Sequence, residues 1–98
     1  MEIQYSNEGG ILEITLTGRL DSATAEGLSR FLEDEMTEET EKVVFDVGGL
    51  DFISSKGLRI LVGVRKQLGE GRVSVKNPNT AVREVLKISG LTEILGVL

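Results

Sequence analysis

The sequence predicts an α/β fold in which a mixed β-sheet packs against helices. Near the start, the segments EIQYS and ILEITLT alternate polar and apolar residues, which is typical of strands that bury one face. Later, the runs KVVFDV and RVSVK alternate with segments whose apolar residues recur every three or four positions, as in amphipathic helices. The expected order is β-β-α-β-α-β-α, with an antiparallel hairpin first and parallel crossovers after it. Residues 1–98 are expected to form a single domain.

The first half of the chain should form a hairpin and a helix. Residues 2–6 and 11–17 are the two expected strands, and two glycines between them can adopt the positive φ of a tight turn. In the helix that follows, Asp21 or Ser22 is the natural N-cap. The apolar residues of its buried face are Ala25, Leu28, Phe31, Leu32 and Met36.

The middle of the chain should provide the central strand and a buried helix. Residues 42–47 are rich in valine, which predicts a strand buried on both faces and ended by Gly48-Gly49. A helix is expected from Ser55 to Leu68, because apolar residues form a stripe there and glycines follow as stop signals.

The last third should add one strand and one helix. Residues 72–76 are the expected strand, and Pro78-Asn79 is a typical start for a helix that buries Val82, Val85 and Leu86 and stops at Gly90. The final segment LTEILGVL is expected to form a short helical turn or strand.

The composition excludes several classes of chemistry. The chain has no cysteine, so disulfides, thiolate metal sites and thiol nucleophiles are impossible. It has no histidine, which removes Ser-His hydrolases, imidazole bases and most zinc sites. We expect no metal and no cofactor.

The charge and hydropathy of the chain argue against nucleic acid and membrane partners. The net charge is −5 and no basic patch is visible, so phosphate backbones and anionic lipids should be repelled. Six of the sixteen acids lie between Glu33 and Glu41, which we interpret as a solvated helix end and loop. No apolar run approaches the roughly 18 residues of a membrane span, and the start MEIQYSNEGG lacks a signal-peptide pattern. A cytoplasmic location is therefore expected.

The stretch FISSKGL, residues 52–58, is the candidate functional site. It lies between a strand and a helix, where ligands and partners of α/β sheets usually bind. One serine would serve as an ordinary N-cap. A phosphate on the other would be stabilised by the free N–H groups and the dipole of the helix, and it would oppose a docked partner by placing a dianion in the contact. Gly57 in the first helical turn suggests a close approach, either to a partner or to the neighbouring loop.

Three motifs in order give the chain a resemblance to a known family. Residues 50–58, LDFISSKGL, preceded by VVFDV, resemble the signature of STAS domains, and particularly of bacterial anti-sigma-factor antagonists. Gly18-Arg19-Leu20-Asp21 resembles the second motif of that family, and Ile88-Ser89-Gly90-Leu91 the third. The similarity covers nearly the whole chain, and it implies a STAS-like fold.

The resemblance also implies a function. Such a protein, when unphosphorylated, binds an anti-sigma factor that is a serine kinase of the histidine-kinase-like ATPase type. Serine phosphorylation releases it, a PP2C-type phosphatase resets it, and transcription is regulated indirectly. Any ATP and magnesium belong to the kinase, and the free antagonist should be monomeric. Carried over position by position, the phosphoacceptor is Ser55, and the expected contact residues are Asp21, Ser54, Lys56, Gly57 and Leu58. Asp21 would serve equally well as a simple N-cap.

Two positions depart from the usual family pattern. Ser54 replaces the usual aspartate before the phosphoacceptor, and Lys56 replaces the usual second hydroxyl. Ser54 is therefore a rival acceptor. Lys56 makes the surface more basic and would be able to neutralise a phosphate on Ser55, which would weaken the switch.

Other classes of function compete with this interpretation. An enzyme would need Ser55 paired with Lys56, but adjacent helical residues point about 100° apart. Asp46 and Asp51 are more consistent with turn caps than with an acid–base pair. We therefore expect no enzyme. The other alternative is a STAS-type subunit or scaffold of a lipid or anion transport assembly or of a signalling assembly, which is not phosphorylated.

Overall fold

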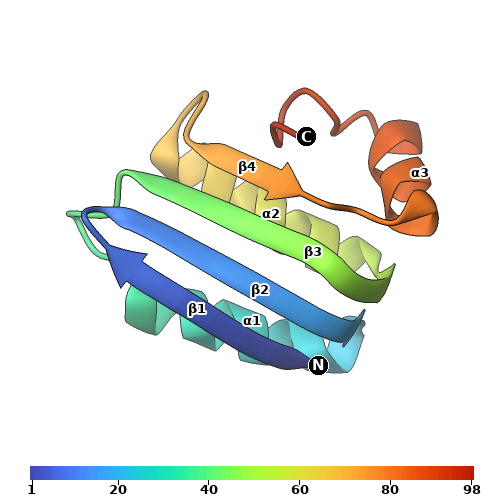
Figure 1. The fold of residues 1–98 in the computed structure, drawn as a ribbon, viewed down its shortest axis with the longest axis horizontal. Coiled ribbons are helices and arrows are strands. Elements are labelled where there is room, and N and C mark those ends of the chain that lie inside the picture. The colour runs from blue at the N-terminus through green and yellow to red at the C-terminus, as the bar shows by residue number, and fades with distance from the viewer.

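The seven predicted elements form in the predicted order in the computed structural model, which describes residues 1–98 (Figure 1). The strands are β1 (Glu2–Glu8), β2 (Ile11–Leu20), β3 (Lys42–Ile53) and β4 (Val73–Lys76). The helices are α1 (Ser22–Glu35), α2 (Ser55–Leu68) and α3 (Thr80–Ile88). The prediction of an α/β fold is confirmed.

The four strands form one mixed sheet in the order β1-β2-β3-β4. β1 and β2 pair antiparallel as a hairpin, whereas β2 with β3 and β3 with β4 pair parallel. This arrangement confirms the expected hairpin followed by crossovers. It also places β3 in the interior of the sheet. Because β2 and β3 run parallel, their carboxyl ends lie at the same edge of the sheet.

The prediction for β3 was wrong in its length. Gly48-Gly49 does not end the strand, which continues to Ile53, and its register against β2 shifts at two places. At Gly49 an added Cβ would lie 3.0 Å from Oγ1 of Thr17 and 3.2 Å from the carbonyl oxygen of Leu16. The glycine lets the two strands approach at this irregularity, so it keeps the pairing intact instead of terminating it.

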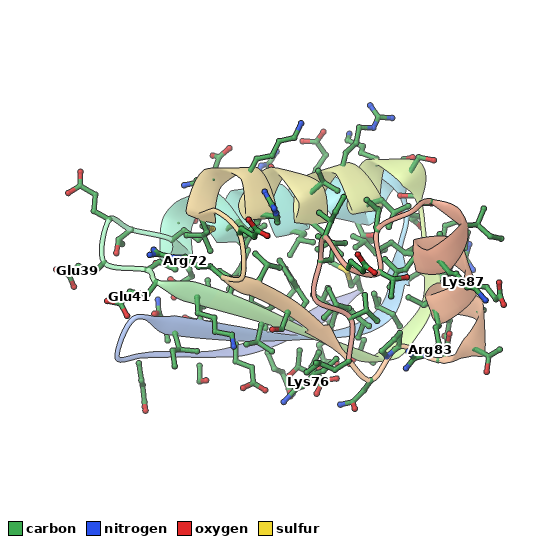
Figure 2. All side chains as sticks on the ribbon, turned by 90° about the horizontal axis from the view of Figure 1, so that it is seen from above. Glu39, Glu41, Arg72, Lys76, Arg83 and Lys87 are labelled. Carbon is green, nitrogen blue, oxygen red and sulfur yellow. The ribbon has the colours of Figure 1, made fainter.

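The prediction that β3 is buried on both faces was also wrong. α1 and α2 lie on the same side of the sheet, which Figure 2 shows nearly edge-on. Val43, Phe45 and Val47 face these helices and are buried, whereas Val44 and Asp46 alternate with them and are partly exposed. Right-handed crossovers that run in one direction across a sheet put their helices on one face, so the opposite face stays open. There Lys76 and Glu13 form an ion pair of 2.8 Å.

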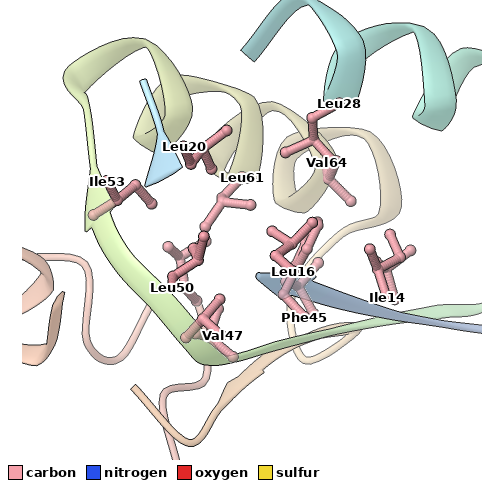
Figure 3. Packing of buried hydrophobic residues seen from close by; sticks show 14 of the residues in the cluster. Ile14, Leu16, Leu20, Leu28, Phe45, Val47, Leu50, Ile53, Leu61 and Val64 are labelled. Carbon is pink, nitrogen blue, oxygen red and sulfur yellow. The ribbon is translucent and has the colours of Figure 1, made fainter. Parts of the chain in front are cut away.

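The core is the layer between the sheet and the two helices (Figure 3). β2 and β3 contribute alternate residues and each helix contributes one apolar face, as the sequence predicted. On α2 the buried side chains are those of Leu61 and Val64, while Leu58 and Ile60 are half-buried. The largest fully buried side chains are those of Phe45, Leu12, Ile14, Leu16, Leu20, Leu28, Leu50, Leu61, Leu86 and Leu95.

The third helix and the tail after it form as expected. α3 buries Val82 and Leu86, and Val85 is half-buried against the core. Its C-cap is Ser89, and Gly90 follows with a φ of 71°, so the predicted stop is confirmed. The last segment forms turns that end in a single parallel bridge between Val97 and Val75. The backbone of Val75 bonds to Gly96 and Leu98 on that side, so the tail covers part of the outer edge of β4.

The acidic run at the end of α1 is exposed to solvent. Five of its six acids are exposed, with Glu35 half-buried. Glu39 and Glu41 project from the loop before β3 in Figure 2. The interpretation of this run as a solvated helix end and loop is confirmed. None of the three helices combines the length and apolar character that crossing a bilayer would require.

We expect an aromatic pair to hold the edge strand β1 onto α1. The rings of Tyr5 and Phe31 meet edge-to-face with centroids 4.9 Å apart. In a double-mutant cycle of Tyr5→Leu and Phe31→Leu, the coupling energy in chemical unfolding should be about 0.5–1.5 kcal/mol. Tyr5→Phe should keep this coupling because it keeps the ring. Simple additivity of the two leucine substitutions would contradict the prediction.

Candidate functional site

The candidate site forms where the ends of β2 and β3 meet. The backbone N–H of Ser54 donates to the carbonyl oxygen of Leu20, with the two atoms 2.8 Å apart. This bond joins the turn before α1 to residues 51–58, here called the serine turn. Asp21 follows Leu20 directly. The motif of residues 18–21 and the motif of residues 50–58, which are far apart in the sequence, therefore lie side by side.

Ser54 is the N-cap of α2, and its hydroxyl is occupied. Its Oγ accepts a hydrogen bond of 3.1 Å from the backbone N–H of Gly57. The side chain is half-buried. A hydroxyl in this role satisfies one of the donors that a helix leaves unpaired at its start, so Ser54 has a structural task.

Ser55 is the first residue of α2, and its hydroxyl does not cap the helix. It is exposed, and its hydroxyl makes no hydrogen bond with the rest of the protein. The free N–H groups and the positive end of the helix dipole lie in the same turn. Of the two serines that the sequence left as rivals, Ser55 is the one whose hydroxyl is open to solvent.

Lys56 is committed to an interaction with α1. Its Nζ lies 2.8 Å from Oε1 of Glu26, and both side chains are partly exposed. The hydrogen bond and charge of Lys56 lower the pKa of the Glu26 carboxyl below its usual range. Lys56 is therefore turned toward the neighbouring helix. Glu26 was missed in the sequence analysis, since nothing local links two residues that only helix packing brings together.

Gly57 is the point of closest approach between α2 and β2. A Cβ at this position would lie 2.7 Å from Cγ of Leu20 and 3.2 Å from Cγ1 of Ile53. Gly57 is buried, so the close approach predicted from the sequence is made within the protein, to the last residues of β2 and β3 and not to a loop. Leu58, the next residue, is half-buried and packs against the core. Only part of its side chain faces outward.

Asp21 is the N-cap of α1. Its Oδ1 accepts from the N–H groups of Thr24 and Ala23 at 2.9 and 3.1 Å. The hydroxyl of Thr24 accepts from the N–H of Asp21 in return, which completes a capping box. These hydrogen bonds hold the pKa of Asp21 below its usual range, and the bond from the Thr24 N–H contributes most. The capping role is confirmed, and a fixed negative charge stands beside the serine turn.

Two further residues at this edge were not singled out by the sequence. Arg19 and Phe52 are partners in the register of β2 and β3, and the guanidinium lies 4.4 Å from the ring centroid. Phe52 keeps 38% of its surface exposed. An exposed aromatic residue at the end of a strand was the available signal, because the chain has only four aromatics. The pair adds a cationic and apolar patch to the site.

The serine turn lines none of the three main hollows of the protein. These hollows have cavity volumes of about 500, 440 and 210 Å³. The carboxylate of Asp46 accepts from the N–H of Gly48 and from the side chain of Asn77. Asp46 and Gly48 both lie within β3, so the prediction that Asp46 caps a turn was wrong. A site with exposed polar and apolar groups outside the main hollows suits contact with a protein better than capture of a small molecule.

Comparison with known proteins gives a consistent result. The model of the STAS domain family matches residues 2–97. A Bordetella bronchiseptica protein named "Putative anti-sigma factor antagonist BtrV" is 37% identical over 99 residues, covering 99% of this chain and 85% of its own length. The anti-sigma F factor antagonist of Paenibacillus polymyxa is 29% identical over 101 residues, covering 99% of this chain and 86% of its own.

Solved structures agree with this in fold. The anti-sigma factor antagonist SpoIIAA in its unphosphorylated form matches with a TM-score of 0.84 at 23% identity, over 99% of this chain and 86% of that one. SpoIIAA of Bacillus in its phosphorylated form matches with a TM-score of 0.75 at 21% identity, over 99% and 91%. The expected STAS-like fold is confirmed.

We expect Gly57→Ala to destabilise the protein by about 1–3 kcal/mol, because the new methyl group would overlap Leu20 in a packed region. Gly63→Ala in the same helix is the matched control. A Cβ at Gly63 meets nothing within 4 Å, so this change should stabilise the protein by roughly 0.5–1 kcal/mol. Chemical unfolding measures both, and equal effects would refute the close-contact role of Gly57.

We expect the cap at Asp21 to make stability depend on pH in the acid range. Its pKa is lower in the folded protein than the ordinary value of 3.8, so its contribution is complete above that value and is lost as the pH falls through the folded pKa. Asp21→Asn keeps an oxygen acceptor but cannot titrate. The difference in unfolding free energy between the two proteins should shrink as the pH falls below 3.8. A constant difference from pH 7 to pH 2 would contradict this.

Proposed function

This chain belongs to the STAS domain family, and from that premise we propose that it is an anti-sigma-factor antagonist switched by phosphorylation of Ser55. Unphosphorylated, it binds an anti-sigma factor and so frees a sigma factor. Phosphorylated, it is released. Residues 1–98 act as one domain, monomeric when free, in the cytoplasm where transcription is regulated.

The observation that carries the proposal is the difference between the two serines. Ser55 is exposed with a free hydroxyl, whereas the hydroxyl of Ser54 is bound to the N–H of Gly57. A phosphate on Ser55 would meet the positive end of α2 without displacing any internal hydrogen bond. A phosphate on Ser54 would disrupt the cap.

The contact surface explains how such a phosphate would act. Ser54 and Lys56 flank Ser55 in the chain, and the Ser54–Leu20 hydrogen bond brings the turn with Asp21 alongside. Leu58 is half-buried in the same helical turn, and Gly57 lets that turn pack directly on Leu20. A phosphoserine adds about −1.5 to −2 charges. Burying that charge against a partner without matching cations costs more than the contact gains, so the complex would dissociate.

The proposed partners are those that membership of the family implies. The anti-sigma factor would itself be the kinase, of the histidine-kinase-like ATPase type, and would hold the ATP and magnesium. A PP2C-type phosphatase would remove the phosphate. The names of the relatives favour this function over the alternative of a transport subunit or an unphosphorylated scaffold.

We expect Ser55→Ala to abolish phosphorylation and Ser54→Ala to leave it in place. The assay incubates each variant with ATP, magnesium and the anti-sigma factor kinase of the same cells, and reads intact mass and phosphopeptides. Ser54→Ala should cost about 0.5–2 kcal/mol of stability through loss of the cap, so it is tested below its unfolding temperature. Phosphate found on Ser54 in the unaltered protein would refute the assignment.

Binding to the same anti-sigma factor provides the second readout of this experiment. Ser55→Ala should bind as the unmodified protein does, and Ser55→Asp should bind more weakly. Ser6→Asp is the control, because Ser6 is an exposed serine on β1 that pairs with Glu13, far from the carboxyl ends of β2 and β3. Equal binding by Ser55→Asp and Ser55→Ala would favour an unswitched scaffold.

A further inference from the structure

We propose that Arg59, and not Lys56, holds the phosphate when Ser55 is phosphorylated. The inference rests on the proposed function, since it needs a phosphate at Ser55, but it concerns residues of this chain that neither the family motifs nor the sequence analysis brought forward. It makes Arg59 a positioning residue for the phosphate.

The spacing of Ser55 and Arg59 on α2 is the first argument. They are four residues apart within one helix, so their side chains lie on the same face, one turn apart. Both are exposed. An anion placed four residues before a cation is the more favourable order of charges in a helix. A phosphate on Ser55 would therefore stand within reach of the Arg59 guanidinium.

The second argument is that Arg59 is free. The protein contains two ion pairs, Lys56 with Glu26 and Lys76 with Glu13, and Arg59 takes part in neither. Its guanidinium makes no hydrogen bond with another group of the protein and no stacking contact with a ring. A planar guanidinium with five donors is well suited to bind two phosphate oxygens at once.

The third argument concerns the competing cations. Lys56 follows Ser55 directly, so its side chain leaves the helix about 100° away from that of Ser55. It is also bound to Glu26 at 2.8 Å, and moving it to the phosphate would leave that carboxylate unpaired. Arg19 lies over the ring of Phe52 at the end of the sheet. Arg59 is the cation that gains a partner without giving one up.

This arrangement would change the surface in two ways at once. The phosphate would lie along the exposed side of α2, and the positive charge of Arg59 would no longer be open to a partner. A partner that binds Arg59 through a carboxylate would lose that contact in the same step. The Lys56–Glu26 pair between α2 and α1 would stay intact.

The test uses the full chain with phosphoserine inserted at position 55 during synthesis, so no kinase is needed. The titration midpoint of the phosphate, followed by ³¹P NMR, is compared in the otherwise unaltered protein, in Arg59→Gln and in Lys56→Gln. An ordinary phosphoserine titrates near about 6. Arg59 favours the dianion, so Arg59→Gln should raise the midpoint by a few tenths of a pH unit, and Lys56→Gln should raise it clearly less.

The opposite order, or equal midpoints in all three proteins, would overturn the inference. Both substitutions are at exposed positions, and a circular dichroism spectrum of each variant confirms that the fold is intact. The Nε–H signal of Arg59 provides an independent readout, since it should shift between the Ser55 and phosphoserine proteins and still do so in Lys56→Gln. Absence of phosphate on Ser55 in the kinase assay would contradict the proposed function and would leave these titrations unchanged. The proposed function and the inference about Arg59 can therefore fail separately.

Discussion

The contact between Gly57 and Leu20 is the constraint on which the site depends. Because residue 57 has no side chain, the first turn of α2 lies directly on the end of β2, and the N–H of Ser54 reaches the carbonyl oxygen of Leu20. That one approach sets Ser54 as a cap, turns Ser55 outward and brings Asp21 alongside. A larger residue would lift the helix and separate all three.

Local signals in the sequence were enough to predict most of the fold. The bounds of α2 were predicted correctly, because the serine cap, the apolar stripe and the glycine at position 69 all act within the helix itself. β3 was not. A glycine pair usually ends a strand, and only the closeness of Thr17 in the neighbouring strand reveals why Gly49 continues this one. The burial of β3 on one face only could not be predicted from the sequence either, because it depends on the side of the sheet on which the helices pack.

The sequence indicated which residues gather at the candidate site, but it indicated only part of their interactions. The expected helix starts pointed to Asp21, to Gly57 and to the serine pair, and the family resemblance selected Ser55. The Lys56–Glu26 and Arg19–Phe52 contacts were missed, since each joins two elements whose relative placement is set by core packing. The same holds for the choice between the two serines, because which hydroxyl serves as the cap is decided by the exact start of the helix.

The free hydroxyl of Ser55 has a consequence for how information would be stored. No internal hydrogen bond depends on it, so a phosphate added there would leave the folded state and its core as they are. The two forms would not relax into each other by thermal motion, as two shapes of one protein do. A signal would be stored as a covalent bond that only enzymes form and remove. The lifetime of that bond would be independent of the stability of the domain that carries it.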